Sequence, residues 1–320
     1  MRRKISFGVL LPDYCGGQVG ENFTSLSKLK EFCRAVEKLG FTSIWHREHF
    51  TASDTTPSSY EPMTTISAVS QMVEKPRLGI ITILTLRHPI IFAKETATLD
   101  VLSGGRVMLC CVVGHREHEF EALGVSMRRR GQKFVESIEI IRRLWMENDV
   151  SWDGEFYKFS HASISPKPLQ KPHPPLLIGS GGRSIDNIQR FERLLMRAAE
   201  LGDGWYAAIN MTPEAVGKAV EIIKTHLKKL GKNEDNYTFT AHKYVLIVDN
   251  ESDARRTVSS ILNVSLEEAR KQQLIGTREE IVNRLEKFTA TGITHFNLAP
   301  LSFDTTTLEF FADEVVPRYI

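Results

Sequence analysis

Two copies of the tetrapeptide His-Arg-Glu-His carry four of the ten histidines in this chain, at residues 46–49 and 115–118. Imidazole nitrogens ligate metals or transfer protons near neutral pH, since the reference pKa of histidine is ~6.5. The flanks of the two copies differ, apart from an apolar run before each copy and a phenylalanine shortly after it. The copies are therefore not a sequence repeat, and each has to be interpreted from the element that carries it.

A zinc site is one interpretation of the second copy. His115 lies three residues before His118 and four before Glu119, so these side chains could share one face of a helix. Cys110 and Cys111 lie nearby in the sequence, but adjacent strand residues point to opposite faces, so both thiols cannot reach one ion. Neither C-x-x-C nor H-E-x-x-H occurs in the sequence. We expect no metal, and we interpret both cysteines as small buried hydrophobic residues.

The composition is that of an average globular protein. The chain has 320 residues, of which 42% are hydrophobic and 25% charged, and its net charge is +2 with the basic residues scattered. Nucleic acid is therefore not an expected partner. The N-terminal apolar run is too short for a signal peptide, and no stretch reaches about 18 consecutive apolar residues, so we expect a cytoplasmic protein without membrane association. The four cysteines are expected to be reduced thiols.

Short apolar runs alternate with segments of helical periodicity along the chain. The first run is followed by apolar residues spaced three or four apart that end at Gly40, as in a strand followed by a helix. Eight such runs occur, and each is continuous rather than alternating, which is expected for strands covered on both faces. They occupy residues 5–11, 42–45, 77–84, 106–113, 175–180, 204–209, 238–248 and 294–300.

Eight strands, each followed by at least one helix, predict a (β/α)8 TIM barrel. A Rossmann fold is less consistent with the sequence, because no G-x-G-x-x-G follows the first strand. Longer connections predict insertions after the fourth strand (148–175), after the fifth strand (184–200) and near the seventh strand. We expect residues 1–320 to form a single domain.

The barrel would place both His-Arg-Glu-His copies at the same end. Each copy begins just past the C-terminal end of a strand, the second and the fourth, and this end carries the active site in TIM-barrel enzymes. We therefore expect both copies to line one mouth, with His46 buried at a strand end and His118 on a solvated turn. The alternative, that the histidines are solvated loop residues, stays open, most of all for His115 and His118.

Segments along nearly the whole chain resemble the luciferase-like family of flavin- and deazaflavin-dependent oxidoreductases. The order and spacing of these segments make the resemblance specific. The closing segment 310–319 and the stretch LDVLSGGR (99–106) look most like the branch that uses coenzyme F420, a 5-deazaflavin. The resemblance implies a TIM barrel that binds the tricyclic ring at the C-terminal ends of its strands. The segments are residues 40–50, 87–109, 119–125, 130–159, 166–182, 201–205, 276–296 and 310–319.

The resemblance also implies catalytic residues. The histidine of a D-H-F-like motif after the second strand is catalytic in the F420 branch, and the matching residue is His49, preceded by the acidic Glu48. Some deazaflavin members carry a glutamate general acid directly after the fourth strand, where this chain has His115. We expect His115 or Glu117 to act as a second acid or base.

The implied cofactor contacts lie at the ends of three strands. The third strand of the family ends in a non-prolyl cis peptide that supports the ring, and the matching bond is Ile81–Thr82; such a bond costs ~3–4 kcal/mol. The cofactor phosphate is expected at Gly179, Ser180, Gly181 and Gly182, beside Arg183. Glycines let backbone N–H groups approach an anion, and a helix starting near Ser184 would point its positive end there. A glycine turn without a ligand is the alternative.

The fourth strand departs from the family pattern. Family members usually carry a glycine-rich run against the ring, whereas this chain has Cys110-Cys111-Val112-Val113-Gly114 and keeps only Gly114. The side chains at positions 110 and 112 are expected to narrow the approach of the ring.

The residues and the resemblance together predict an F420-dependent oxidoreductase that transfers a hydride between C5 of the ring and a small organic substrate. The alternative is an FMN-dependent, alkanal-type luciferase-like monooxygenase, with His49 beside the flavin. A flavin-binding relative without activity is a third hypothesis. The expected partners are a small-molecule substrate and further copies of the chain in a homodimer or higher homo-oligomer.

Overall fold

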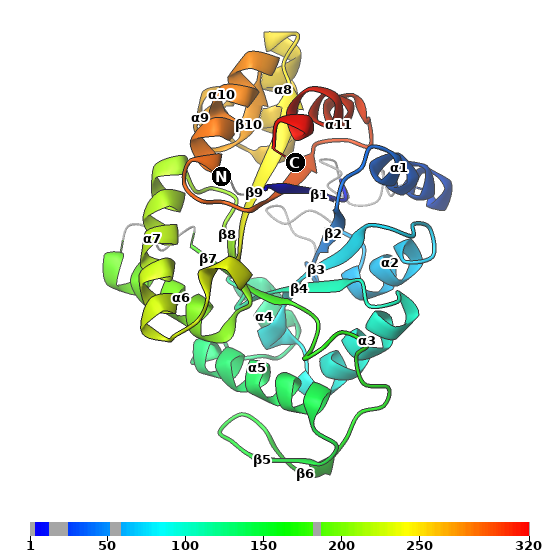
Figure 1. Ribbon diagram of the computed structural model, residues 1–320, viewed down its shortest axis with the longest axis vertical. Coiled ribbons are helices and arrows are strands. Elements are labelled where there is room, and N and C mark those ends of the chain that lie inside the picture. The colour runs from blue at the N-terminus through cyan, green and yellow to red at the C-terminus, as the bar shows by residue number, and fades with distance from the viewer. Residues whose placement is uncertain (1–3, 13–24, 52–58, 182–186, 320) are drawn as a thin grey trace.

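The computed structural model describes residues 4–12, 25–51, 59–181 and 187–319. Eight parallel strands form a closed barrel, because β8 at one end of the sheet order also pairs with β9 (Figure 1). The eight-stranded barrel predicted from the apolar runs is confirmed. Its strands are β1 (Ser6–Leu10), β2 (Ser43–Arg47), β3 (Arg77–Ile83), β4 (Val107–Val112), β7 (Leu176–Ser180), β8 (Gly204–Ala207), β9 (Thr238–Ile247) and β11 (His295–Pro300).

One helix layer surrounds the barrel, and local sequence signals set where many of its helices begin. Ser25, Thr212 and Thr277 cap the helices that follow them by accepting hydrogen bonds from backbone N–H groups of the first turn. Proline, whose fixed φ suits a first helical turn, opens three helices, one of which is the helix that Thr212 caps. The barrel helices are α1 (Leu26–Lys38), α2 (Pro62–Val69), α3 (Pro89–Leu102), α5 (Arg130–Met146), α6 (Ile188–Leu201), α7 (Pro213–Lys229), α10 (Arg278–Thr289) and α11 (Thr306–Phe310).

Additional elements extend the connections between barrel strands. After β4 come the short helix α4 (Glu117–Ala122) and, beyond α5, the hairpin β5 (Val150–Asp153) and β6 (Lys158–Ala162), which lies outside the helix layer in Figure 1. Near the seventh barrel strand come α8 (Glu251–Leu262), α9 (Leu266–Gln272) and β10 (Leu274–Gly276), with β10 paired to β9. The segment 184–200 mainly supplies α6, which packs against α7 and β7 as a barrel helix. Short 3-10 or π turns are η1 (Leu84–Leu86), η3 (Glu234–Asn236), η4 (Phe311–Val315) and η5 (Val316–Arg318).

The core has two parts, one between the strands and the helices and one inside the barrel. Cys111 belongs to the first and Cys110 to the second, and both are fully buried, so the two thiols face opposite sides of β4 as the strand geometry requires. Inside the barrel, a Cβ on Gly79 would lie 1.9 Å from the Trp45 ring. Glycine at this position therefore makes room for the indole that fills the barrel. Among the described helices, none combines the length and hydropathy that a membrane crossing requires.

Candidate active site at the barrel mouth

His49 lies just beyond β2, at the C-terminal mouth of the barrel. Its Nδ1 atom is 3.4 Å from Oε1 of Glu119 on α4, and the same oxygen accepts a 2.7 Å hydrogen bond from the Phe50 backbone N–H. The His49 side chain is 15% exposed and that of Glu119 only 1%, so the carboxylate lies beneath the imidazole and the imidazole keeps an edge open to solvent. The first His-Arg-Glu-His copy thus pairs with the residue that follows the second.

The charge of Glu119 follows from its neighbours. Burial on its own raises the pKa of this carboxyl, but the contact with His49 and the hydrogen bond from Phe50 outweigh it, and the pKa lies below its usual value. Glu119 is therefore a carboxylate at neutral pH. A buried carboxylate 3.4 Å from Nδ1 favours one orientation of the ring, an arrangement found where a histidine acts in acid–base chemistry.

Glu119 is the main site residue that the sequence did not identify as catalytic. The spacing of Glu119 from His115 predicts only that the two side chains share a helical face, and so indicates no role beyond that of a metal ligand. The structure instead turns Glu119 toward the loop after β2, a contact that no local pattern encodes. Among the described residues, no group of three or more His, Cys, Asp or Glu side chains is placed to hold a metal ion.

Glu48 fixes the loop that carries His49. It is 4% exposed and accepts hydrogen bonds from the Thr82 hydroxyl (2.8 Å), the Ile83 backbone N–H (2.8 Å) and Arg87 Nε (2.8 Å). Arg87 also pairs with Glu61, the N-cap of α2, at 2.5 Å. The carboxylate thereby joins the end of β2 to the end of β3 and to the start of α2, which positions His49 at the mouth.

The predicted cis peptide at Ile81–Thr82 is wrong. The cis bonds of the described residues both precede prolines, Pro166 and Pro172. The β3 strand stays regular, pairing Thr82 with Cys111 and continuing to Ile83, while the Thr82 side chain is turned to Glu48. Of the two predicted cofactor residues, only Ile81 lies at the interior mouth, where it is half-buried.

The loop after β4 contains one glycine that its turn requires, followed by exposed residues on the rim of the barrel mouth. Gly114 has a φ of +79°, and a Cβ there would lie 2.5 Å from Ile83, so the turn requires glycine. His115 and Glu117, the predicted second acid or base, are exposed, on the rim of the mouth and at the start of α4. Neither joins the buried pair of His49 and Glu119.

The remaining histidines of the two copies have other surroundings. His46 is fully buried, as predicted for a strand end, and its Nε2 lies 3.0 Å from the Tyr60 carbonyl. His118 lies within helix α4 and is half-buried, so its predicted place on a solvated turn is wrong. The reason is that the helix begins at Glu117, directly after the strand-end loop.

Cys110 and Val112 fill the wall between β4 and β7, and a glycine on the neighbouring strand accommodates them; that they narrow the approach of a ring stays a prediction. A Cβ on Gly179 would lie 2.5 Å from Val112 Cγ1 and 3.2 Å from Cys110 Sγ. The volume added at β4 is therefore matched by the missing side chain on β7. The half-buried Ile81, Val112 and Tyr244 complete an apolar lining above the barrel interior.

The glycine turn after β7 rests on β8 and on the loop that follows it. Ser180 Oγ accepts a 3.0 Å hydrogen bond from Trp205 Nε1, and its carbonyl accepts one from the Ala208 N–H at 3.2 Å. Gly181 has a φ of +114°, and a Cβ there would lie 2.5 Å from Met211 Sδ. Trp205 is fully buried and belongs to the core.

Two of the predicted phosphate-site residues, Gly182 and Arg183, lie outside the described residues, as does the helix start expected near Ser184. The described part of the turn is nevertheless well defined. The Ser180 hydroxyl oxygen accepts from Trp205 and its O–H is still able to donate, so an anion there would be bound by this hydroxyl together with backbone groups.

Polar side chains inside the barrel were also missed. Arg47 Nη1 donates to the Tyr244 hydroxyl at 3.1 Å, and Asn297 Nδ2 donates to the Tyr206 hydroxyl at 2.5 Å. Burial, and then the nearby positive charges of Arg47 and Lys243, lower the pKa of His242 well below its usual value, so this imidazole is neutral. Inward-facing strand positions of a barrel alternate with outward ones, and this period could have placed these residues inside.

The residues of the mouth fit a flavin-type cofactor. Ile81, Val112 and Tyr244 offer an apolar surface for a planar ring, whereas the space beside Gly179 and Gly181 is filled by Val112, Cys110 and Met211. His49 lies at the same rim with an acid–base partner. A ring on this lining and a phosphate at the glycine turn would use residues that the barrel already brings together.

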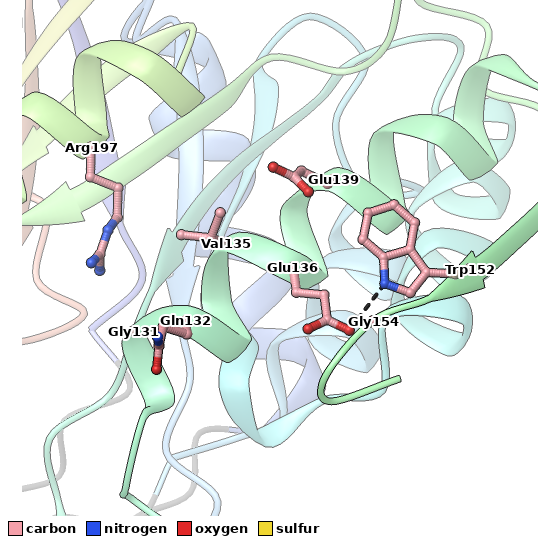
Figure 2. A pocket seen from close by; sticks show the side chains of 8 residues that line it. All are labelled: Gly131, Gln132, Val135, Glu136, Glu139, Trp152, Gly154 and Arg197. Carbon is pink, nitrogen blue, oxygen red and sulfur yellow. Dashed lines mark hydrogen bonds between the residues drawn. The ribbon is translucent and has the colours of Figure 1, made fainter. Parts of the chain in front are cut away.

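A separate groove lies on the outside of the molecule. It has a volume of about 330 Å³ and runs along α5, between the β5–β6 hairpin and Arg197 of α6 (Figure 2). Glu136 on its floor accepts a 3.0 Å hydrogen bond from Trp152 Nε1 and binds two backbone N–H groups of the hairpin. None of the predicted site residues lines this groove.

A TIM barrel with an acid–base pair, an apolar ring surface and a glycine turn at its mouth defines an oxidoreductase that binds a flavin-type cofactor. The sequence pattern described as "Luciferase-like monooxygenase" matches residues 5–273, and the chain belongs to this family. The proteins named below include a relative that depends on FMNH2 and a structure of the same fold that depends on F420. The family predicted from the sequence is confirmed, and the chain is an enzyme of this oxidoreductase family.

The chain is similar to relatives that use either cofactor. It is 27% identical over 270 residues to the FMNH2-dependent dimethylsulfone monooxygenase of Pseudomonas putida, covering 82% of this chain and 71% of the relative. The monooxygenase RslO1 from Streptomyces bottropensis has the same fold, with a TM-score of 0.83, 23% identity and coverage of 99% and 100% of the two chains. An F420-dependent secondary alcohol dehydrogenase matches with a TM-score of 0.82, 21% identity and full coverage of both chains. At these identities the two structures show the fold alone.

Proposed function

We propose that this protein is a monooxygenase that uses reduced FMN to oxidise a small organic substrate. The observation that carries the proposal is the pairing of His49 with the buried Glu119 at a mouth lined by apolar groups. One acid–base pair beside an apolar ring surface supports oxygen transfer by a flavin, where the cofactor supplies the electrons. The FMNH2-dependent relative, 27% identical over 270 residues, supports the same assignment at a higher identity than the two solved structures have.

Reduced FMN, when bound, activates molecular oxygen, so that one oxygen atom enters the substrate and the other leaves as water. His49 moves the proton that this exchange requires. Glu119 lies beside Nδ1, which leaves Nε2 as the nitrogen that gives or takes the proton at the reacting oxygen. Glu48 and Arg87 keep the loop in place, so the imidazole does not have to be repositioned in each cycle.

Hydride transfer with F420 is the second candidate, and the segments that resemble the deazaflavin branch favour it. It assigns a second acid or base to His115 or Glu117, and both side chains are exposed on the rim rather than buried with Glu119. The two functions share the ring position, but a 5-deazaflavin does not support the oxygen chemistry. Cofactor identity therefore decides between them.

The test is a titration of the purified protein with FMN, in both redox states, and with F420, followed by fluorescence. We expect binding of FMN and no binding of F420, together with substrate-dependent oxygen consumption when a flavin reductase supplies reduced FMN. The variants His115→Gln and Glu117→Gln should then keep turnover within about 2-fold, because the proposal assigns proton transfer to His49 and not to these two residues. Binding of F420 and not FMN would overturn the proposal in favour of hydride transfer.

A further inference from the structure

Lys243 on β9 is a fully buried lysine without an ion-pair partner among the described residues. Side chains alternate along the strand, so Lys243 points out of the barrel between two residues that face inward. Its Nζ atom lies 2.9 Å from the Ile209 carbonyl and 2.6 Å from the Met211 carbonyl, and 4.6 Å from the centre of the Phe288 ring. Lysine is seldom buried completely, so these contacts call for a structural explanation.

Both carbonyls belong to the loop between β8 and α7. Gln273, just before β10, donates from Nε2 to the same Ile209 carbonyl at 2.9 Å and accepts at Oε1 from the Tyr244 backbone N–H at 3.0 Å. The buried side chains of Lys243 and Gln273 therefore both donate hydrogen bonds to the backbone of the β8–α7 loop. Removing either side chain would leave the Ile209 carbonyl with one donor instead of two. Removing Lys243 would also leave the buried Met211 carbonyl without its side-chain donor, which costs more than the net value of a hydrogen bond.

This loop forms the support of the glycine turn. The Met211 side chain is fully buried, and its Sδ lies 2.5 Å from the position that a Cβ on Gly181 would take. The Ala208 N–H, at the start of the loop, donates to the Ser180 carbonyl at 3.2 Å. The path of the turn at Gly181 therefore depends on where Met211 lies, and Met211 is held by Lys243.

We propose that Lys243 is a positioning residue for the phosphate end of the cofactor, acting through the β8–α7 loop on the glycine turn after β7. The inference rests on the proposed function, in which the turn binds that phosphate through its backbone. Backbone N–H groups bind an anion well only when their directions are fixed, because each freely moving segment must be ordered on binding. Lys243 itself does not touch the cofactor, so its loss acts on the phosphate and leaves the ring contacts in place.

The experiment compares FMN with riboflavin, which has the same ring and lacks the phosphate. Lys243→Met removes the amine and keeps the volume. The matched control is Lys232→Met, because Lys232 also donates to two carbonyls, those of Ala199 and Glu200 at 2.7 Å each, at the C-terminal end of α6 and away from the mouth. Dissociation constants come from flavin fluorescence, and backbone amide exchange over 208–212 reports the loop.

We expect Lys243→Met to weaken FMN binding by about 10-fold and riboflavin binding by less than 2-fold, with faster amide exchange in the loop. The control variant Lys232→Met should change the dissociation constant of neither FMN nor riboflavin. An equal loss for both ligands, or no loss, would overturn the inference while leaving the proposed function standing. If the wild type binds F420 instead, the same comparison uses F420 and its phosphate-free chromophore.

Should Lys243→Met fail to fold, Gln273→Leu removes the second donor to the Ile209 carbonyl and is expected to shift the same FMN-to-riboflavin ratio, by a smaller factor. An unchanged ratio in that variant would equally overturn the inference. A wild type that binds no flavin and no deazaflavin overturns both this inference and the proposed function.

Discussion

At the scale of single residues, the chemistry depends on how His49 is held. An imidazole alone on a loop exchanges protons in any orientation, whereas the contact between Nδ1 and the buried Glu119 selects one ring orientation. The histidine could be chosen from the sequence because a motif surrounds it. Its partner could not, because α4 meets the loop after β2 only in the folded barrel.

His49→Ala is expected to lower kcat by about 10²- to 10⁴-fold, the range of a lost general acid or base, and to change FMN affinity less than 2-fold. Glu119→Gln should cost on the order of 10-fold, equivalent to ~1.4 kcal/mol, because the ring stays present but is held less well. The double variant should be no slower than His49→Ala. Steady-state kinetics and flavin titration measure these effects, and additive losses would show that Glu119 acts independently of His49.

Lys243 gives a pH prediction for stability. Burial lowers its pKa to about 7, whereas the unfolded chain restores the ordinary value near 10.5. Between these values the unfolded state binds more protons than the folded state, so this group makes the free energy of unfolding rise with pH, by up to about 1.4 kcal/mol per pH unit. Below pH 7 the lysine is protonated in both states and the slope disappears.

Urea unfolding of the wild type and Lys243→Met at pH 7, 8 and 9 tests this slope. The stability difference between wild type and variant should move in favour of the wild type as pH rises. A difference that stays constant across this range would mean that the buried amine is charged throughout. The control variant Lys232→Met should change the slope less, because burial also lowers the pKa of Lys232 but Asp203 and Glu200 partly offset that shift.

At the scale of elements, the large side chains of β4 pack against a glycine of β7. The larger residues Cys110 and Val112 on β4 face the glycine of β7, and their contact distances leave no room for a further methyl group. The sequence showed that the glycine-rich run of β4 was missing. It did not show that Gly179 makes room for the larger residues of β4. The reason is that α5 and a hairpin separate β4 from β7 in the chain, and the two strands become neighbours only in the folded barrel.

Gly179→Ala should therefore destabilise the protein by about 1–3 kcal/mol through overpacking. Adding Val112→Ala should recover most of this loss, since the new methyl group would occupy the space that Val112 Cγ1 leaves. Thermal or urea unfolding of the two single variants and the double variant measures the coupling. Independent, additive losses would show that the two strands are not packed in this way.

At the scale of the whole molecule, the barrel could be predicted from eight continuous apolar runs, because strands covered on both faces leave that pattern. The connections were less predictable. The segment after the fifth strand is mainly the barrel helix α6, and Lys243 interrupts the apolar run of β9 without any local sign of the loop that buries it. Such details depend on contacts between elements far apart in the chain, which periodicity does not report.

Stability is expected to be uneven across the molecule. The elements α8, α9 and β10 pack around a small cluster of their own, separate from the main core, and β10 adds only three residues of pairing to β9. Units with few buried apolar contacts open at lower free energy than the core strands. Amides of α8 and α9 should therefore exchange with solvent faster than those of β1, β2 and β11.

Val258→Ala should make this difference larger, because Val258 is fully buried in the small cluster and contributes nothing to the barrel core. We expect faster exchange confined to α8, α9 and β10, with the midpoint of global urea unfolding nearly unchanged. The matched change is Val220→Ala, at a buried position of α7 in the main core. It should lower the global free energy of unfolding by roughly 1–3 kcal/mol and shift the urea midpoint down accordingly. Equal effects of the two variants on the global transition would show that the additional elements and the barrel unfold as one unit.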